Sequence, residues 1–317
     1  MKKKKNFNEF MKEQIEQLEE ECRYGTSHVH ESTLKSFSKF CKSKIISFSM
    51  LNRANLKEYE CQLRRNKKSW NTVSTYMRVL RSIYNKAADE KLVPYNPRLF
   101  SHVYTGVESN TKRALEPEEM NQLLNSTPAK ELTKELTLCR VWSILMFQLQ
   151  GMPFVDLAHL QKNDIQGSTI TYLRQKTSTR IVVEVPPSAM ELIRKYQSTN
   201  TNSPYLLPIL NGKETGKKEY KEYQLALRTM NYNLNRLATK CGITTPVSSY
   251  TTRHTWATLA KYCNFSEQLI CDALGHSSVK VTETYLKSFK REEISKANKK
   301  IISYVSNDGK KGSTVHK

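Results

Sequence analysis

The chain has 317 residues and a formal net charge of +21 at pH 7, from 51 lysines and arginines against 30 aspartates and glutamates. A surplus of this size indicates a polyanionic partner, with nucleic acid ahead of an anionic membrane surface. No apolar run approaches the roughly 20 residues of a membrane-spanning helix. The lysine-rich start is followed by polar residues instead of the apolar stretch of a signal peptide. We therefore expect a cytosolic protein without a membrane partner.

The 7 cysteines are dispersed and form no Cys-x-x-Cys pair. An odd, scattered set argues against a disulfide framework and against a zinc site. No cluster of acidic residues suited to Mg²⁺ accompanies the motifs described below. We expect neither a metal nor a cofactor.

Basic residues are concentrated in three windows without any acid, at about 62–88, 165–183 and 223–266. A carboxylate facing DNA phosphate is repelled, so such windows are typical of a surface that follows a phosphate backbone. Ordinary solvated faces would give the same pattern, and this alternative stays open. The candidate DNA-binding residues are Arg64, Arg65, Lys67, Lys68, Arg78, Arg81, Arg228 and Arg236.

Helical periodicity dominates the first part of the chain. Apolar stripes predict helices at about 7–18, 34–45, 56–63 and 73–87, and Pro94 and Pro97 end the last of them. Periodicity then fails, and Gly106, Ser109 and Asn110 are typical of a linker. We expect a four-helix DNA-binding domain at 1–105 and a linker at 106–112.

A second domain is expected at 113–317, mainly α with a small antiparallel β-sheet. Helices are predicted to start near Pro117, to span about 136–149, 188–197 and 219–241, and to start again near Thr252 and Ser266. Runs at 169–172 and 181–185 predict a β-hairpin with Lys176 at its tip. An apolar stripe from Ile294 to Val305 fits a helix packed on its own domain or on a neighbouring subunit.

Three short motifs near the C-terminus carry the candidate chemistry: Arg253-His254, Gly275-His276 and Tyr285. Arginine and histidine stabilise charge on a phosphoryl group in transfer. A tyrosine hydroxyl is a possible covalent nucleophile. Taken singly, each residue has a plain structural interpretation, because the chain has 16 tyrosines and a histidine after a glycine helix stop can bond helix carbonyls.

Together, in this order and behind the hairpin Lys176, these motifs resemble the tyrosine recombinases of the phage integrase family. The resemblance covers about residues 5–305. It implies an N-terminal SAM-like core-binding domain, a C-terminal catalytic domain and a C-terminal exchange helix. The sequence from Gly151 to Leu157 and from Tyr250 to Ala257 is most similar to that of integrases of Bacteroides-type mobile elements.

The resemblance also implies a mechanism. Tyr285 would attack a phosphate of double-stranded DNA and form a 3′-phosphotyrosine, while Arg253 and His276 stabilise the added charge. Lys176 would protonate the leaving 5′ oxygen, and His254 and Asp156 would orient their neighbours. The working form would be a homotetramer on two DNA sites, at the nucleoid of a bacterial cytoplasm.

Two departures from the family pattern bear on activity. Pro153 stands where the family has its first catalytic arginine, and Gln150 occupies a second position at which relatives carry one. Arg140 is then the candidate to compensate, with an ordinary helix-surface arginine as the alternative. Tyr250 replaces a histidine, and with a side-chain pKa near 10 it suits hydrogen bonding to phosphate better than general-base catalysis.

Two alternatives to an active recombinase remain at this point. One is a catalytically impaired DNA-binding homologue that lacks the first arginine. The other is a nicking–closing enzyme of the type IB topoisomerase kind, which the two-domain layout and the exchange helix disfavour.

Overall fold

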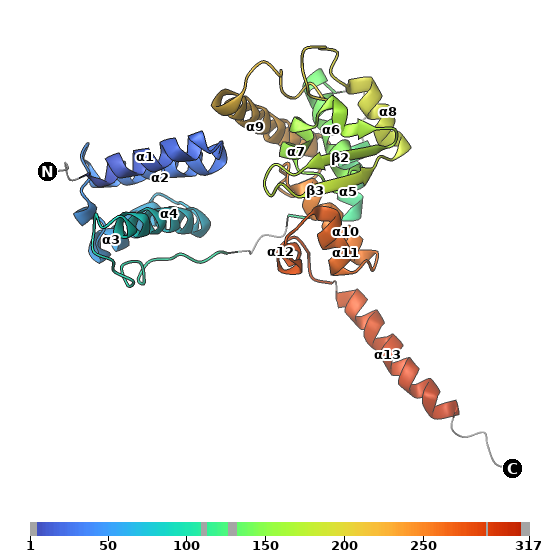
Figure 1. Cartoon of the computed structure of the whole chain (residues 1–317). Helices are drawn as coiled ribbons and strands as arrows, with labels where there is room; N and C mark the ends of the chain where they lie inside the picture. The colour runs from blue at the N-terminus through green and yellow to red at the C-terminus, as the bar shows by residue number, and fades with distance from the viewer. Residues whose placement is uncertain (1–4, 109–112, 126–131, 290, 312–317) are drawn as a thin grey trace. The chain divides into compact units, whose positions relative to one another are not determined.

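A computed structural model describes residues 5–108, 113–125, 132–289 and 291–311 of the chain (Figure 1). The chain divides into two compact units: the first comprises Met1–Asn110 and Gly212–Gln224, the second Thr111–Asn211 and Leu225–Lys317. Part of the expected linker, 109–112, lies outside the described residues. The segment just before it, 104–108, has no helix or strand.

The N-terminal part of the first unit is built from four helices. They are α1 (Phe7–Glu20), α2 (Tyr24–Cys41), α3 (Arg53–Arg65) and α4 (Trp70–Asp89), with a 3₁₀ turn at Phe48–Met50. The four predicted helices are therefore confirmed. The second begins ten residues earlier than its apolar stripe and ends before Ile45, because Lys42 takes the left-handed conformation at φ 51° and terminates α2.

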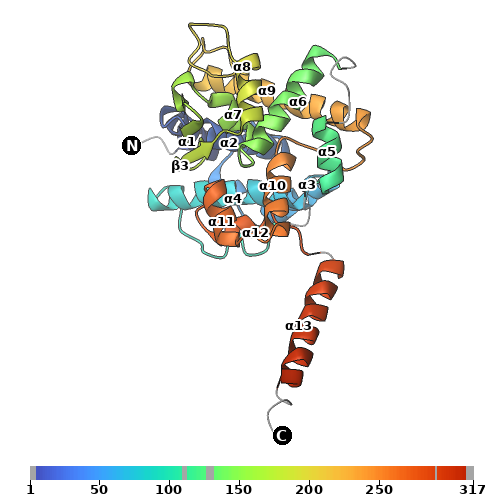
Figure 2. The same ribbon diagram turned by 90° about the vertical axis from the view of Figure 1, so that its right-hand side faces the viewer.

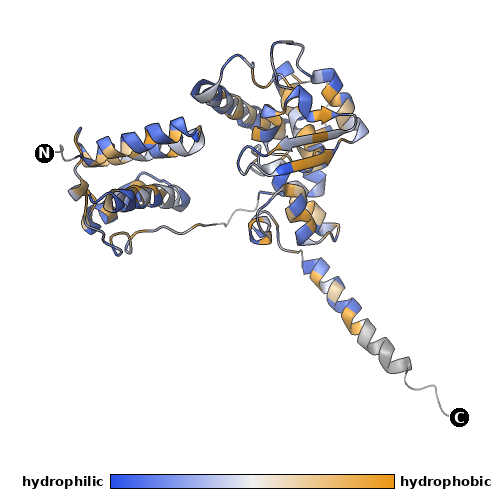
Figure 3. Ribbon diagram, viewed as in Figure 1, coloured by the Kyte–Doolittle hydropathy of each residue, from blue (hydrophilic) through white to orange (hydrophobic). Residues whose placement is uncertain are grey.

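The apolar stripes of these helices form one core. Phe7, Leu56, Met77 and Leu80 are completely buried in it, and burying each such side chain contributes roughly 1.5–3 kcal/mol. Figure 3 shows hydrophilic and hydrophobic residues on each of the four helices, as amphipathic helices around a shared core require. The exposed sides carry the basic residues that the sequence singled out in this unit.

The second unit is mainly helical. Its helices are α5 (Pro117–Asn125), α6 (Lys134–Gln148), α7 (Phe154–His159), α8 (Pro187–Tyr196), most of α9 (Gly216–Lys240), α10 (Thr251–Tyr262), α11 (Glu267–Leu274), α12 (Val279–Glu283) and α13 (Arg291–Lys311). Periodicity missed α7 and α12, which are too short to show it. No helix in the described part of the chain is long and apolar enough to cross a bilayer.

A three-stranded antiparallel sheet completes the second unit. Strands β1 (Ile165–Gln166), β2 (Thr169–Leu173) and β3 (Arg180–Glu184) lie in the order β1-β2-β3. The predicted hairpin is confirmed, with Ile170 opposite Val183 in the β2–β3 register. Strand β1 was not predicted, because two residues carry no alternation.

Helices α10, α11 and α12 are grouped together, as Figure 2 shows. Ala257 and Ala260 of α10 pack with Ile270 and Leu274 of α11 in a small apolar cluster. Helix α11 starts at its N-cap Ser266, near which the sequence predicted a helix start, and ends at its C-cap Gly275, which is left-handed at φ 61°. The chain therefore turns sharply just before His276.

Candidate active site

Arg253 lies at the centre of the candidate site, on the first turn of α10. Its side chain is 2% exposed. Nη1 donates to the carbonyl oxygen of Gly151 at 2.9 Å, and Nη2 donates to that of Leu274 at 2.5 Å. Nε has no hydrogen-bond partner among the described residues. Burial lowers the pKa of Arg253, but the group stays charged because the normal pKa of arginine is above 12.

Gly151 brings its carbonyl to Arg253 through a reversal at the end of α6. Gln150 and Gly151 are both left-handed, with φ 57° and 65°. A Cβ on Gly151 would lie 3.2 Å from the Cα of Arg253. The glycine therefore serves both the turn and the close packing on α10.

His276 is joined to Arg253 on one side of its ring and to Thr282 on the other. Nε2 lies 3.1 Å from Nη2 of Arg253, and Nδ1 lies 2.8 Å from Oγ1 of Thr282. A guanidinium only donates, so Nε2 must be the acceptor and Nδ1 must carry the ring proton. Burial, reinforced by Arg253, Arg174 and Lys176, lowers the pKa of His276 to about 3. The imidazole is therefore neutral at physiological pH.

Tyr285 follows α12 and lies in a cluster of rings. Its centroid is 4.9 Å from that of His276, in a stacked arrangement, and 4.5 Å from that of His254. The Cζ atom of Arg253 lies 5.7 Å from the Tyr285 ring centroid. The Tyr285 carbonyl oxygen accepts from Thr258 at 3.3 Å and lies 3.4 Å from Nδ1 of His254. Helix α10 of the same chain thus holds the backbone of Tyr285.

Tyr250 borders this cluster at the N-cap of α10. Its ring stacks on Tyr285 with 6.5 Å between centroids, and the side chain is 37% exposed. Partial burial, followed by the nearby Tyr285, raises the pKa of Tyr250. Tyr250 is therefore protonated at neutral pH and is able to donate a hydrogen bond.

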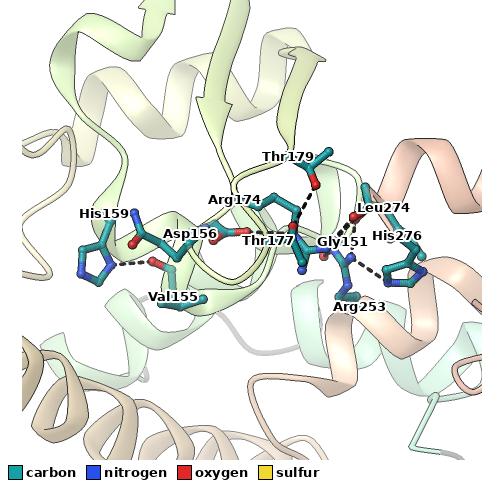
Figure 4. A network of polar contacts seen from close by, with 12 residues as sticks. Gly151, Val155, Asp156, His159, Arg174, Thr177, Thr179, Arg253, Leu274 and His276 are labelled. Atoms are coloured by element: carbon teal, nitrogen blue, oxygen red, sulfur yellow. Dashed lines mark hydrogen bonds and ion pairs between the residues drawn. The ribbon is translucent and has the colours of Figure 1, made fainter. Parts of the chain in front are cut away.

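The β2–β3 hairpin adds Lys176 and Arg174 to the site. Lys176 is exposed in the turn, as predicted. Arg174 is instead 5% exposed, and its Nη1 donates to the carbonyl oxygens of Leu274, at 3.2 Å, and Gly275, at 2.9 Å. Figure 4 shows Arg174 and Leu274 beside Arg253 and His276.

Asp156, on the first turn of α7, fixes the base of the hairpin turn. Its Oδ1 accepts from the backbone N–H of Gln175 at 2.9 Å. Its Oδ2 lies 3.5 Å from Nε of Arg174, an ion pair too long to be a good hydrogen bond. Burial raises the pKa of Asp156, against the opposing effects of Gln175 and Arg174.

The sequence identifies Arg174 only as one of the basic residues of an acid-free window. The missed signal is the alternation along β2. Ile170 and Tyr172 are buried and Leu173 is 61% exposed, so the two-residue period continues onto Arg174 and turns it inward.

Pro153, at the position of the missing arginine, is the N-cap of α7. Arg140 is 9% exposed within α6, so the alternative of an ordinary surface arginine is wrong. Its compensating role remains a prediction.

The candidate DNA-binding side chains are exposed in both units. Two of those in the first unit also make internal contacts. Arg64 lies over the Trp70 ring at 4.5 Å from its centroid, and Arg65 pairs with Glu58. No group of three or more His, Cys, Asp or Glu residues that could hold a metal occurs within the described ranges.

Each of the two parts of the chain matches a known protein family. Residues 6–103 match the phage integrase SAM-like domain, and residues 113–292 match the phage integrase family. A tyrosine recombinase XerC of Halalkalibacterium halodurans is 24% identical over 274 residues, covering 81% of this chain and 84% of the relative.

Two structures of lambda integrase share the fold. In a dimer bound to a COC′ core site, the TM-score is 0.64 at 14% identity, over 89% of this chain and 77% of that one. In a tetramer bound to a Holliday junction, the TM-score is 0.60 at 14% identity, over 83% and 72% of the two chains.

Proposed function

This chain belongs to the phage integrase family, and on that premise we propose that it is a site-specific DNA recombinase that cuts and rejoins strands through a covalent bond to Tyr285. The observation that carries the proposal is the cluster of Tyr285, His276 and Arg253. Three residues from α10, the turn after α11 and the turn after α12 meet within one hydrogen-bonded and stacked group.

The proposed step is an exchange of phosphodiester bonds. Tyr285 releases its hydroxyl proton to solvent water, its Oη–P bond forms, and the P–O5′ bond breaks. Lys176, exposed on the hairpin turn, protonates the departing 5′ oxygen. The 3′-phosphotyrosine conserves the bond energy, so a 5′-hydroxyl of a second duplex reverses the step without a cofactor.

Arg253 and His276 act differently on the phosphate. Arg253 supplies positive charge in a buried setting, where such charge stabilises a transition state most effectively. His276 is neutral, so it contributes a hydrogen bond. The Thr282 hydroxyl both donates and accepts, and it can hold the ring when the proton moves from Nδ1 to Nε2 to face a phosphate oxygen.

DNA is the proposed partner, bound by the exposed basic residues of both units. A homotetramer on two sites agrees with the lambda integrase tetramer on a Holliday junction. Ile294, Ile301 and Ile302 of α13 are 58%, 64% and 56% exposed, which fits a helix that docks on a neighbouring subunit. We also propose that the protein acts on bacterial DNA in the cytoplasm and belongs to a mobile element.

The impaired-homologue alternative has no support from these findings, because Arg253, His276 and Tyr285 are assembled despite Pro153. A covalent-capture experiment tests activity without knowledge of the target site. Nicked duplexes with a randomised core are incubated with the protein and denatured, and DNA that remains attached is sequenced. The result expected is an adduct on a defined sequence whose tryptic peptide contains Tyr285.

Tyr285→Phe abolishes the adduct, whereas Tyr232→Phe, at a 66% exposed tyrosine of α9, does not. Tight binding by the wild type without any adduct would overturn the proposal. An adduct that persists in Tyr285→Phe would overturn the nucleophile. Relaxation of supercoiled DNA without strand exchange between two sites would favour the nicking–closing enzyme.

A further inference from the structure

The missing family arginine leaves a specific deficit at the proposed phosphate site. Pro153 carries no charge, and Gln150 cannot replace a guanidinium. Among Arg253, His276 and Lys176, Arg253 would then provide the buried positive charge, with Lys176 exposed at the hairpin turn. A second guanidinium beside Arg253 would restore the two-pronged contact with phosphate oxygens that arginine makes well.

Arg174 brings a guanidinium to that place. Its Nη1 and the Nη2 of Arg253 donate to one atom, the carbonyl oxygen of Leu274, at 3.2 and 2.5 Å. The two nitrogens are therefore separated by no more than the sum of these distances. Each hydrogen bond spans about 2.7–3.2 Å, so both nitrogens are able to bond oxygens of a single phosphate group.

The charge balance at this point calls for an anion. Within the described residues of the second unit, Asp156 is the one buried carboxylate, and it lies beside Arg174 at 3.5 Å. Arg174 and Arg253 repel each other, and Nε of Arg253 has no hydrogen-bond partner in the described part of the chain. Two buried guanidiniums with one nearby carboxylate leave a net positive charge that a phosphate would neutralise.

Gly275 makes the approach of Arg174 possible. A Cβ on Gly275 would lie 3.0 Å from Cδ of Arg174 and 2.4 Å from Cδ1 of Ile181. The glycine that turns the chain toward His276 therefore also admits the hairpin arginine. The Asp156 contacts hold Arg174 and the adjacent Gln175 backbone from the other side.

We propose that Arg174 is a catalytic residue whose guanidinium binds the scissile phosphate together with Arg253, in the role left open by Pro153. This inference rests on the proposed recombinase function. The hydrogen bonds of the Arg174 side chain within the described residues come from Nη1. Nη2 of Arg174 is therefore able to bond one phosphate oxygen, and Nη1 exchanges a backbone carbonyl for another.

Two nicked substrates of one captured sequence test the assignment: one has a normal scissile phosphodiester, the other a methylphosphonate. The methylphosphonate replaces one charged oxygen by a methyl group, so a residue that neutralises this charge becomes dispensable. Arg174→Ala lowers the rate of adduct formation about 10²-fold on the phosphodiester. On one stereoisomer of the methylphosphonate, it comes within a few-fold of the wild type.

Arg174→Lys retains a charge and serves if Arg174→Ala does not fold. It shows about a tenfold loss on the phosphodiester and none on the methylphosphonate. Arg194→Ala, at an exposed arginine in the last turn of α8, is the matched control and behaves as wild type on both substrates. Thermal unfolding and DNA binding are measured for every variant.

A loss at Arg174 that is equal on the two substrates overturns the inference, because a structural defect is indifferent to the charge of the phosphate. If the methylphosphonate substrate rescues Arg140→Ala but not Arg174→Ala, the inference is also overturned. That result would favour Arg140 of α6 as the second phosphate-binding arginine. Absence of any wild-type adduct overturns the proposed function itself. A wild-type adduct with an unrescued Arg174 defect overturns this inference alone.

Discussion

The candidate site has two halves of different construction. The helical half consists of α10–α12 with Arg253, His276 and Tyr285, which lie within 33 residues of sequence. The hairpin half consists of α7 and the β2–β3 turn with Asp156, Arg174 and Lys176. Helix caps and short loops position the residues of the helical half, so its motif can be recognised from the sequence. The hairpin half depends on contacts across about a hundred residues, such as Arg174 with Leu274, and there the motif has changed.

With Arg174 in the role proposed above, a catalytic charge has a different place in the sequence from the family pattern. Pro153, two residues after Gly151, carries no arginine, but the carbonyl end of α11 receives guanidiniums from both halves. A site defined by its geometry tolerates substitution in one segment if another segment reaches the same point.

The largest effect is expected for Arg253→Lys. Lysine retains the charge but lacks the fork that bonds Gly151, Leu274 and His276 at once. Adduct formation falls about 10²–10³-fold, measured on a captured suicide substrate. Arg194→Lys is the control. Activity within threefold of the wild type would show that the helical half does not depend on this fork.

Gly275→Ala tests the point at which the two halves meet. The left-handed φ of 61° and the 2.4 Å approach to Ile181 both oppose a side chain. We expect a loss of about 2–3 kcal/mol in the free energy of unfolding, measured with urea. Gly167→Ala is the matched control, since its φ is also 61° but no atom lies within 4 Å of its Cβ position. Equal losses at the two glycines would mean that the contact with the hairpin half contributes nothing.

Thr282→Val tests the hydrogen bond that positions His276 within the helical half. Valine fills the same buried space but cannot bond Nδ1 of His276. We expect about a tenfold slower adduct formation, the size of one lost hydrogen bond to a positioned group. Thr282→Ser keeps the hydroxyl and stays close to the wild type. A serine variant as slow as the valine variant would point to the methyl group instead.

The last comparison concerns the pH dependence of stability. The folded pKa of His276, about 3, lies below the ordinary value near 6.5. Between these values the unfolded chain binds a proton that the native state does not, so stability falls as pH falls through this window. Urea unfolding at pH 7.5 and 5 should therefore show a greater loss for the wild type than for His276→Gln. An equal loss would mean that His276 titrates normally in the native protein.

The sequence predicted much of this molecule for identifiable reasons. Long amphipathic helices such as α1 and α4 show their period, and the hairpin alternates. The helical half of the site was recognisable because its residue types and spacings are local. The burial of Arg174 was not predicted, because a basic residue beside a turn is usually solvated. Only the alternation of buried and exposed residues along β2 indicates that Arg174 points inward. The burial of Arg140 escaped because a helix that is apolar nearly all round gives no preferred direction to one arginine.

Arg253 holds the fold and is also the proposed phosphate ligand. Its bonds to Gly151 and Leu274 connect segments 102 and 21 residues away, from a side chain that is almost wholly buried. A donor of Nη1 or Nη2 that turns toward DNA is withdrawn from one of these internal connections, and only Nε is unbonded within the described residues. Stability and activity are therefore in direct competition within one side chain, and stabilising substitutions around it should be the ones that slow the enzyme.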